Sequence, residues 1–431
     1  MVAAARDFED APLMRVHWRL VIGATTGYIS DGYTLGVVGI ALASAEHDLA
    51  LTPAWLGWLG GASLAGLLVG ALLSGSIADR FGRRIVFAYN MAVFVALSLL
   101  QLFATSAPQL LILRFVLGVV LGTDYVVVKA LLAEFMPRHK RGRALSLMGV
   151  AWAAGYTLAY LAGFLLKDSH AHAWRVILAS SALPALLALP LRMGAPESPL
   201  WLLLKGRRTD AQRLIDTALG PGYGLPAAQP ANTVSWLKLL RGHGRVTFVA
   251  STLYVCLVVP YFAVSTFIPQ VMTALKVNGA EAAGIIYILG LLLGSLAGFW
   301  LVDAFPRRAF VVGSFFLTSV ALLVCTAAAH LPAAFVVVSF AVFSCVLSAA
   351  QAQIYVYLPE LFPTAVRASG IGFAVAVSRL GAAAGTAFLP VAVSRFGVQM
   401  ALWICLGLLA FGGLVCLRLA PETRGSRLAT T

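Results

Sequence analysis

The chain has 431 residues, of which 60% are hydrophobic and 11% are charged, and its formal net charge is +14. A soluble protein of this length carries about a quarter charged residues and could not bury so much apolar surface, so a soluble globular protein is excluded.

Twelve hydrophobic segments alternate with short polar turns, and each is long enough to cross a hydrocarbon core about 30 Å thick. Because backbone amides in lipid must be satisfied internally, we expect each segment to be a helix. The predicted spans are 17–43, 55–78, 85–105, 108–135, 144–166, 173–193, 246–274, 281–302, 309–329, 333–358, 368–393 and 398–420.

The spans divide into two groups of six. A charged N-terminal tail, 1–16, precedes the first group, 17–193, and we expect no cleavable signal peptide there. A polar linker, 194–245, separates it from the second group, 246–420, and a tail, 421–431, follows. The linker pattern predicts one amphipathic helix around Asp210–Leu219.

The basic residues are distributed asymmetrically about the predicted membrane. With the N-terminus in the cytoplasm, only four of the 31 lie outside, namely Lys167, Arg175, Lys276 and Arg395. Three more, Arg114, Lys129 and Arg379, fall within spans, and the rest are assigned to the cytoplasmic side. This is the positive-inside rule, which predicts an inner-membrane protein with both termini in the cytoplasm. The positive charge therefore indicates topology and no nucleic-acid partner.

The two halves are related in sequence. Asp79-Arg-Phe-Gly-Arg-Arg84 recurs as Asp303-Ala-Phe-Pro-Arg-Arg308, and Glu134-Phe-Met-Pro137 recurs as Glu360-Leu-Phe-Pro363. Pro196-Glu-Ser198 recurs as Pro421-Glu-Thr423, and all three repeats share an offset of about 225 residues. Repeats at one offset indicate a duplicated six-helix unit.

The repeated loops carry carboxylates and guanidinium groups at the cytoplasmic helix ends. Partly desolvated ion pairs there could hold the cytoplasmic ends of the two halves together and bias the direction in which the protein opens. A role in topology alone is the alternative. The predicted gating residues are Asp79, Arg83, Arg84, Glu134, Arg143, Asp303, Arg307, Arg308, Glu360 and Arg367.

Four charged residues, Asp31, Asp124, Lys129 and Arg379, fall deep inside predicted spans. An ionised side chain there costs several kcal/mol, so each needs a reason. Two acids sharing a low-dielectric site cannot both stay ionised, so Asp31 and Asp124 are predicted to carry protons. Arg114 lies near the outer end of its span, where it could snorkel or brace a neighbouring helix.

The two deep basic residues, Lys129 and Arg379, are predicted to bind the negative charge of a cargo, since Arg can bind a carboxylate with two hydrogen bonds. Polar and aromatic residues around them complete the predicted substrate site, namely Tyr33, Tyr156, Gln270, Gln351 and Tyr355. For Tyr254 and Tyr287, a place in an interfacial aromatic belt is an equally good interpretation. The five cysteines lie inside spans without paired spacing, and we predict no metal site or cofactor.

These motifs resemble known families. Gly75-Ser-Ile-Ala-Asp-Arg-Phe-Gly-Arg-Arg84 resembles the signature loop of the major facilitator superfamily. Pro196-Glu-Ser-Pro-Leu-Trp201 and Tyr357-Leu-Pro-Glu-Leu-Phe-Pro-Thr-Ala-Val-Arg367 resemble its sugar-porter, organic-ion and aromatic-acid branches. The resemblance implies an all-α membrane protein, with twelve transmembrane helices in two pseudo-symmetric six-helix bundles.

Two further motifs concern the cargo. Asp31-Gly-Tyr33, together with Arg379-Leu-Gly-Ala382, resembles the aromatic-acid and related metabolite–proton symporters. Gly122-Thr-Asp-Tyr125 is similar to a motif of phosphate–proton symporters, but a single arginine stands where their eleventh span would have a lysine.

The resulting hypothesis is proton-coupled symport of a small organic anion, including aromatic carboxylates, by alternating access in a lipid bilayer, with a monomer as the functional unit. Transport of phosphate, a sugar or a zwitterion, or export of an anion, are alternatives within the class. A nontransporting receptor on a transporter scaffold is the alternative from another class. An embedded enzyme and an ATP-driven pump find no supporting motif.

Overall fold

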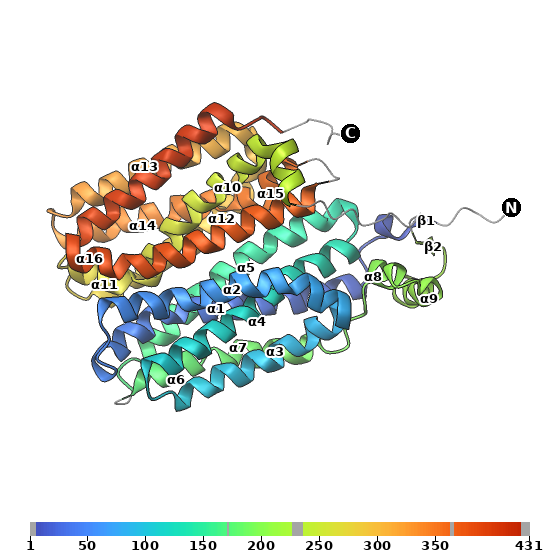
Figure 1. The fold of residues 1–431 in the computed structure, drawn as a ribbon, viewed down its shortest axis with the longest axis horizontal. Helices are drawn as coiled ribbons and strands as arrows, with labels where there is room; N and C mark the ends of the chain where they lie inside the picture. The colour runs from blue at the N-terminus through green and yellow to red at the C-terminus, as the bar shows by residue number, and fades with distance from the viewer. Residues whose placement is uncertain (1–5, 170–171, 226–235, 363–365, 424–431) are drawn as a thin grey trace.

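The computed structural model describes residues 6–169, 172–225, 236–362 and 366–423, and the side chains of Asp79, Asp303 and Arg367 lie outside that description. The described chain is a set of long, roughly parallel helices in two bundles that lie side by side (Figure 1). Both termini lie at one end of the molecule, which we call the terminal face, and the other end is the opposite face (Figure 1).

The first bundle holds seven helical segments that make six spans. They are α1 (Arg15–Asp48), α2 (Pro53–Phe81), α3 (Arg83–Leu100) extended by a 3-10 turn at Gln101–Phe103, α4 (Ala107–Phe135), α5 (Arg138–Leu166), α6 (Ala173–Ala179) and α7 (Ala182–Arg192). The sixth span is broken between α6 and α7 at Ser180 and Ser181.

The second bundle repeats this plan. It consists of α10 (Trp236–Thr266), α11 (Ile268–Ala274), α12 (Ala280–Ala304), α13 (Arg307–Ala328), α14 (Ala333–Ala350), α15 (Ala352–Glu360) and α16 (Arg367–Leu419). Helix α16 contains a kink at Gly397, whose φ of 82° is outside the helical range, and it therefore forms the eleventh and twelfth spans. The predicted span 333–358 is broken at Gln351, between α14 and α15.

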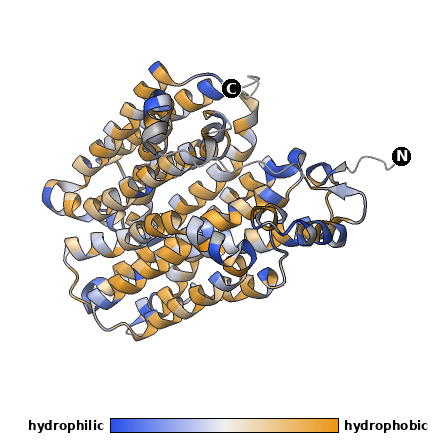
Figure 2. Ribbon diagram, turned by 45° about the vertical axis from the view of Figure 1, so that its right-hand side comes forward, coloured by the Kyte–Doolittle hydropathy of each residue, from blue (hydrophilic) through white to orange (hydrophobic). Residues whose placement is uncertain are grey.

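The outer surface of both bundles is apolar. Large side chains such as Phe103, Leu165 and Trp300 are more than 70% exposed, which water would disfavour and lipid would not. Hydrophobic residues run along the helices, while hydrophilic residues gather at the helix ends and around the N-terminal segment (Figure 2). Length and composition mark ten described helices as candidate spans; α1 and the division of α16 at Gly397 account for the predicted twelve.

A small module covers the terminal face of the first bundle. Strands β1 (Arg6–Asp7) and β2 (Tyr223–Gly224) pair in parallel, and η1 (Phe8–Asp10), α8 (Pro199–Leu204) and α9 (Arg208–Leu219) pack beside them. The predicted linker helix is confirmed as α9, whose apolar residues Ile215 and Leu219 cover the buried ring of Phe8. Arg138 binds Asp7 and Glu9 of the tail at 2.9 and 2.5 Å.

Glycines bring the two bundles into close contact toward the opposite face. A Cβ added at Gly39 of α1 would lie 1.8 Å from the carbonyl oxygen of Thr266, and one at Gly57 of α2 would lie 2.0 Å from that of Ala387. Lys167 of α5 forms an ion pair with Glu281 of α12 at the same end. Since these contacts join one bundle to the other, the central space is closed toward the opposite face.

We expect Gly57→Leu to favour opening toward the opposite face, because no L side chain fits against the Ala387 backbone while the bundles touch. Overpacking costs about 1–3 kcal/mol, which shifts the equilibrium by roughly fivefold to 150-fold. Spin labels at the exposed positions Asp168 and Asn278 would report a longer distance. Gly407→Ala is the control, because no atom lies within 4 Å of a Cβ added there. An unchanged distance in Gly57→Leu would contradict this account of the closure.

Candidate functional site

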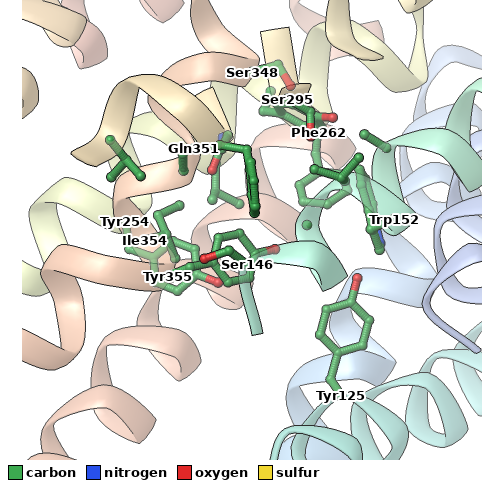
Figure 3. Close-up of a pocket in the computed structure, with 18 of the residues that line it drawn as sticks. Tyr125, Ser146, Trp152, Tyr254, Phe262, Ser295, Ser348, Gln351, Ile354 and Tyr355 are labelled. Carbon is green, nitrogen blue, oxygen red and sulfur yellow. The ribbon is translucent and has the colours of Figure 1, made fainter. Parts of the chain in front are cut away.

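A cavity lies between the two bundles, about midway along them, and both contribute to its wall. Tyr125 of α4 and Trp152 of α5 face Tyr254 of α10 and Tyr355 of α15 across it, and Phe262 of α10 packs edge-on against Trp152 with ring centres 5.8 Å apart (Figure 3). The polar groups of the wall are the hydroxyls of its tyrosines, the indole N–H of Trp152, and the side chains of Ser146, Ser295, Ser348, Gln351 and Arg379. The cavity is therefore an aromatic box whose wall also carries hydroxyls, one amide and one permanent charge.

Arg379 of α16 supplies that charge. Its guanidinium is buried, lies 5.7–5.8 Å from the ring centres of Tyr125, Tyr254 and Phe262, and donates one hydrogen bond, of 3.3 Å, to the Tyr254 hydroxyl. Its Nε has no hydrogen-bond partner, and no carboxylate of the described residues lies within ion-pair distance. A buried cation held by aromatic rings and one hydroxyl, without a carboxylate, can accept an anionic ligand.

Lys129 of α4 lies at the edge of this box. Its ammonium is 5.5 Å from the ring centre of Tyr125 and 5.4 Å from that of Tyr355, and the side chain is half-buried. The break between α14 and α15 places Gln351 in the cavity wall, where its amide donates to the carbonyl of Leu257 at 3.3 Å. Of the predicted substrate residues, Arg379, Gln351 and Tyr355 therefore line the cavity and Lys129 adjoins it.

The other three predicted substrate residues lie elsewhere. Tyr33 shares a 2.9 Å hydrogen bond with Ser180 inside the first bundle. Tyr156 stacks on Trp152 with ring centres 5.2 Å apart, behind the cavity wall. Gln270 is in α11, toward the opposite face, and neither polar atom of its amide has a hydrogen-bond partner.

A second cluster of charges lies inside the first bundle, beside the aromatic box. Asp124 of α4 receives two charge-assisted hydrogen bonds from Arg192 of α7, at 2.5 and 2.9 Å, and a third from the amide of Asn90 at 3.2 Å. The side chains of Asp124 and Arg192 are 0% exposed. Bidentate geometry of this kind compensates part of the desolvation of both charges.

Asp31 of α1 is the acid of the cluster that has no ion-pair partner among the described residues. It is also 0% exposed, the charges that act on it most strongly are those of Asp124 and Arg192, and neither of its carboxylate oxygens accepts a hydrogen bond from the described residues. Asp31 and Asp124 thus belong to one electrostatic cluster, and their role in proton coupling stays a prediction. Because Arg192 neutralises only one of the two acids, a proton on Asp31 makes the cluster neutral and supplies a donor toward Asp124.

Tyr125 connects the two sites, because it follows Asp124 in α4. Its ring lies 5.1 Å from that of Tyr28, whose hydroxyl donates to the Tyr125 carbonyl at 3.4 Å, and its other neighbours are Arg379 and Lys129. Tyr28 is three residues, about one turn, before Asp31 on α1. A single helix segment thus carries an acid of the charge cluster and a wall of the cavity.

Some sequence interpretations were wrong. Arg192, assigned to the cytoplasmic side by the charge count, is buried against Asp124, and its position at the end of the predicted span 173–193 was the available signal. Tyr254 and Tyr287 are not belt residues, since Tyr254 lines the cavity and Tyr287 is fully buried with its hydroxyl 3.0 Å from Ser265. Of the two alternatives for Arg114, the structure has the second: the side chain is buried and braces α1 by donating to the carbonyl of Thr34 at 3.2 Å.

The repeated loops make matching contacts in the two halves. Arg83 binds Glu134 at 3.2 Å, and the backbone amides of Arg83 and Arg84 donate to Glu197. In the second half, Arg307 binds Glu360 at 3.4 Å, and the amides of Arg307 and Arg308 donate to Glu422.

These described contacts join helices of the same half, not the two halves to one another as expected. Arg143 is exposed in α5. The predicted contacts of Asp79, Asp303 and Arg367 lie outside the described side chains. A gating role for the group stays a prediction. Among the described residues, no cluster of three metal-ligating side chains occurs.

Comparison with known proteins assigns the family. A family model described as "Sugar (and other) transporter" matches residues 20–431. The chain belongs to this family. It is a transporter of the major facilitator superfamily and not an enzyme, which confirms the resemblance and the fold predicted from the motifs.

Two relatives and one solved structure illustrate the membership. The transporter is 38% identical over 420 residues to the inner membrane metabolite transport protein YgcS of Escherichia coli K12, covering 96% of this chain and 94% of that protein. It is 29% identical over 443 residues to the niacin transporter NiaP of Acinetobacter baylyi, covering 97% of each. Its fold matches the partially occluded inward-open xylose transporter XylE of E. coli with a TM-score of 0.83, at 22% identity, covering 96% of this chain and 100% of that one.

Proposed function

We propose that this transporter carries a small aromatic carboxylate across the inner membrane together with protons. The observation that carries the proposal is the aromatic box around Arg379, whose guanidinium is buried with no carboxylate partner among the described residues. A cargo carboxylate would occupy the guanidinium, and its flat ring would pack among Tyr125, Trp152 and Phe262.

The composition of the wall favours this cargo over the alternatives. A neutral sugar would leave the buried guanidinium without a counter-charge, and phosphate needs several cations or donors around a tetrahedral ion. The described wall is mainly aromatic, with one guanidinium. NiaP, a relative along its whole length, is named for niacin, which is a pyridine ring with one carboxylate.

Proton coupling rests on Asp31, a buried acid without a hydrogen-bond donor beside the Asp124–Arg192 ion pair. In this proposal the terminal face is cytoplasmic, in agreement with the positive-inside distribution. The closed opposite face would then make the described conformation inward-facing.

A thermal-shift screen of the purified protein tests the cargo class. Benzoate and nicotinate are expected to stabilise the protein, by about 2.7 kcal/mol at a hundred times the dissociation constant. Cyclohexanecarboxylate tests whether an aromatic ring is required, and nicotinamide and benzyl alcohol test whether the carboxylate is required. Xylose and phosphate test the other cargo classes. Stabilisation by xylose or phosphate, without any by the aromatic acids, would overturn the proposal.

A further inference from the structure

Arg192 lies in a groove of α1 that only glycine permits. A Cβ added at Gly27 would lie 1.5 Å from the Arg192 Nη2 atom, and one at Gly23 would lie 3.3 Å from its Cγ. Gly23, Gly27 and Asp31 are spaced four residues apart, so they share one face of α1. The guanidinium of Arg192 therefore lies along the face of α1 that also carries Asp31.

The guanidinium is held on every side. Its Nε donates to the carbonyl of Gly23 at 2.9 Å, Nη1 donates to the carbonyl of Phe87 at 3.3 Å, and its carbon lies 4.5 Å from the centre of the Phe87 ring. Both terminal nitrogens bind Asp124. If Arg192 served only to link α7 to α4 through Asp124, it would not require glycines on α1. That helix is a third one, and it carries the second acid, Asp31.

We propose that Arg192 is a positioning residue for proton coupling: it keeps Asp124 ionised, so that Asp31 alone takes up the transported proton, and it supplies the counter-charge when Asp31 releases that proton. The ionisable and charged groups that face Asp31 are Asp124, Tyr125, Lys129, Arg192 and Tyr28. Within this set, Arg192 contacts both α1, through the carbonyl of Gly23, and the other acid, Asp124. The inference rests on the proposed proton coupling but not on the identity of the cargo.

Infrared difference spectroscopy of the purified protein across pH tests this without any cargo. In the wild type, one buried carboxylic acid should titrate, and its C=O band should be absent in Asp31→Asn. In Arg192→Gln, the band should persist to a pH about 1–3 units higher, and a second acid, Asp124, should join it, because both acids have lost their cation. Arg192→Lys, which keeps the charge, should restore titration close to that of the wild type.

Gly27→Ala provides a test in which all three charged groups remain. The added methyl group must displace the flexible end of Arg192, so the titration should move in the same direction as in Arg192→Gln, while Gly407→Ala should leave it unchanged. In proteoliposomes, Arg192→Gln should keep cargo exchange and lose gradient-driven accumulation.

A lower melting temperature with an unchanged titration in Arg192→Gln and Gly27→Ala would overturn the proposal and leave a purely structural ion pair. A band that survives in Asp31→Asn would also overturn it, because another acid would then hold the proton. Wild-type protein that titrates as expected, yet binds no aromatic acid, would contradict the proposed cargo and leave the role of Arg192 standing.

Discussion

Asp31→Asn is expected to abolish accumulation of the cargo against its gradient while leaving exchange between cargo inside and outside the vesicle. Asparagine mimics the protonated, neutral acid, and it can still donate toward Asp124, so the charge cluster keeps its balance. The conformational change that needs a neutral cluster should therefore proceed, but no proton can be released. Paired uptake and counterflow assays in proteoliposomes measure the two properties separately.

The matched control is Glu46→Gln, which neutralises an exposed acid on the same helix. It should leave both assays at wild-type levels. Asp31→Asn protein that still accumulates cargo with an unchanged dependence on pH would remove Asp31 from the coupling mechanism. Asp124→Asn is a less informative variant, because it leaves the buried Arg192 without its carboxylate partner. Breaking a buried ion pair in this way lowers the stability of the folded protein by about 3–5 kcal/mol.

Arg379→Gln should weaken cargo binding by about tenfold to a hundredfold, since a charge-assisted contact contributes about 1.5–3 kcal/mol. The loss should be confined to carboxylates, because the aromatic walls remain. Tyr254→Phe removes the hydroxyl that accepts from Arg379, and it should have a smaller effect. Lys129→Gln should also weaken binding, but less than Arg379→Gln, because Lys129 adjoins the cavity without lining it. Calorimetric titration with benzoate measures all three.

Arg395→Gln is the control on the same helix, at an exposed position far from the cavity. It should bind benzoate as the wild type does. Equal affinity in Arg379→Gln and the wild type, in protein of normal melting temperature, would show that the cargo charge is bound elsewhere.

The helices and the duplicated plan could be predicted from the sequence, because hydropathy and repeat spacing are local properties. The breaks at Ser180 and Gln351 and the kink at Gly397 were less accessible, since they interrupt segments without changing their hydropathy. The deep charges Asp31 and Arg379 were also found by sequence reasoning, because the cost of burying a charge applies wherever the partner lies.

Partners across helices could not be read from the sequence. The Asp124–Arg192 pair joins residues 68 positions apart in the chain. The contacts of Arg379 with the rings of Tyr125, Tyr254 and Phe262 depend on how the two bundles pack against each other. The glycines of α1 illustrate the same limit. Gly23 and Gly27 could have been general packing positions, and only the packed structure shows that they make room for a guanidinium.

Gradient-driven uptake by the wild-type protein tests the central claim most directly. Proteoliposomes with an inward proton gradient should accumulate radiolabelled benzoate or nicotinate above the external concentration, and a protonophore should abolish the accumulation. Labelled xylose and phosphate should not accumulate under the same gradient. Equilibration of the aromatic acids that ignores the gradient, or accumulation of xylose or phosphate in their place, would contradict proton-coupled transport of an aromatic carboxylate.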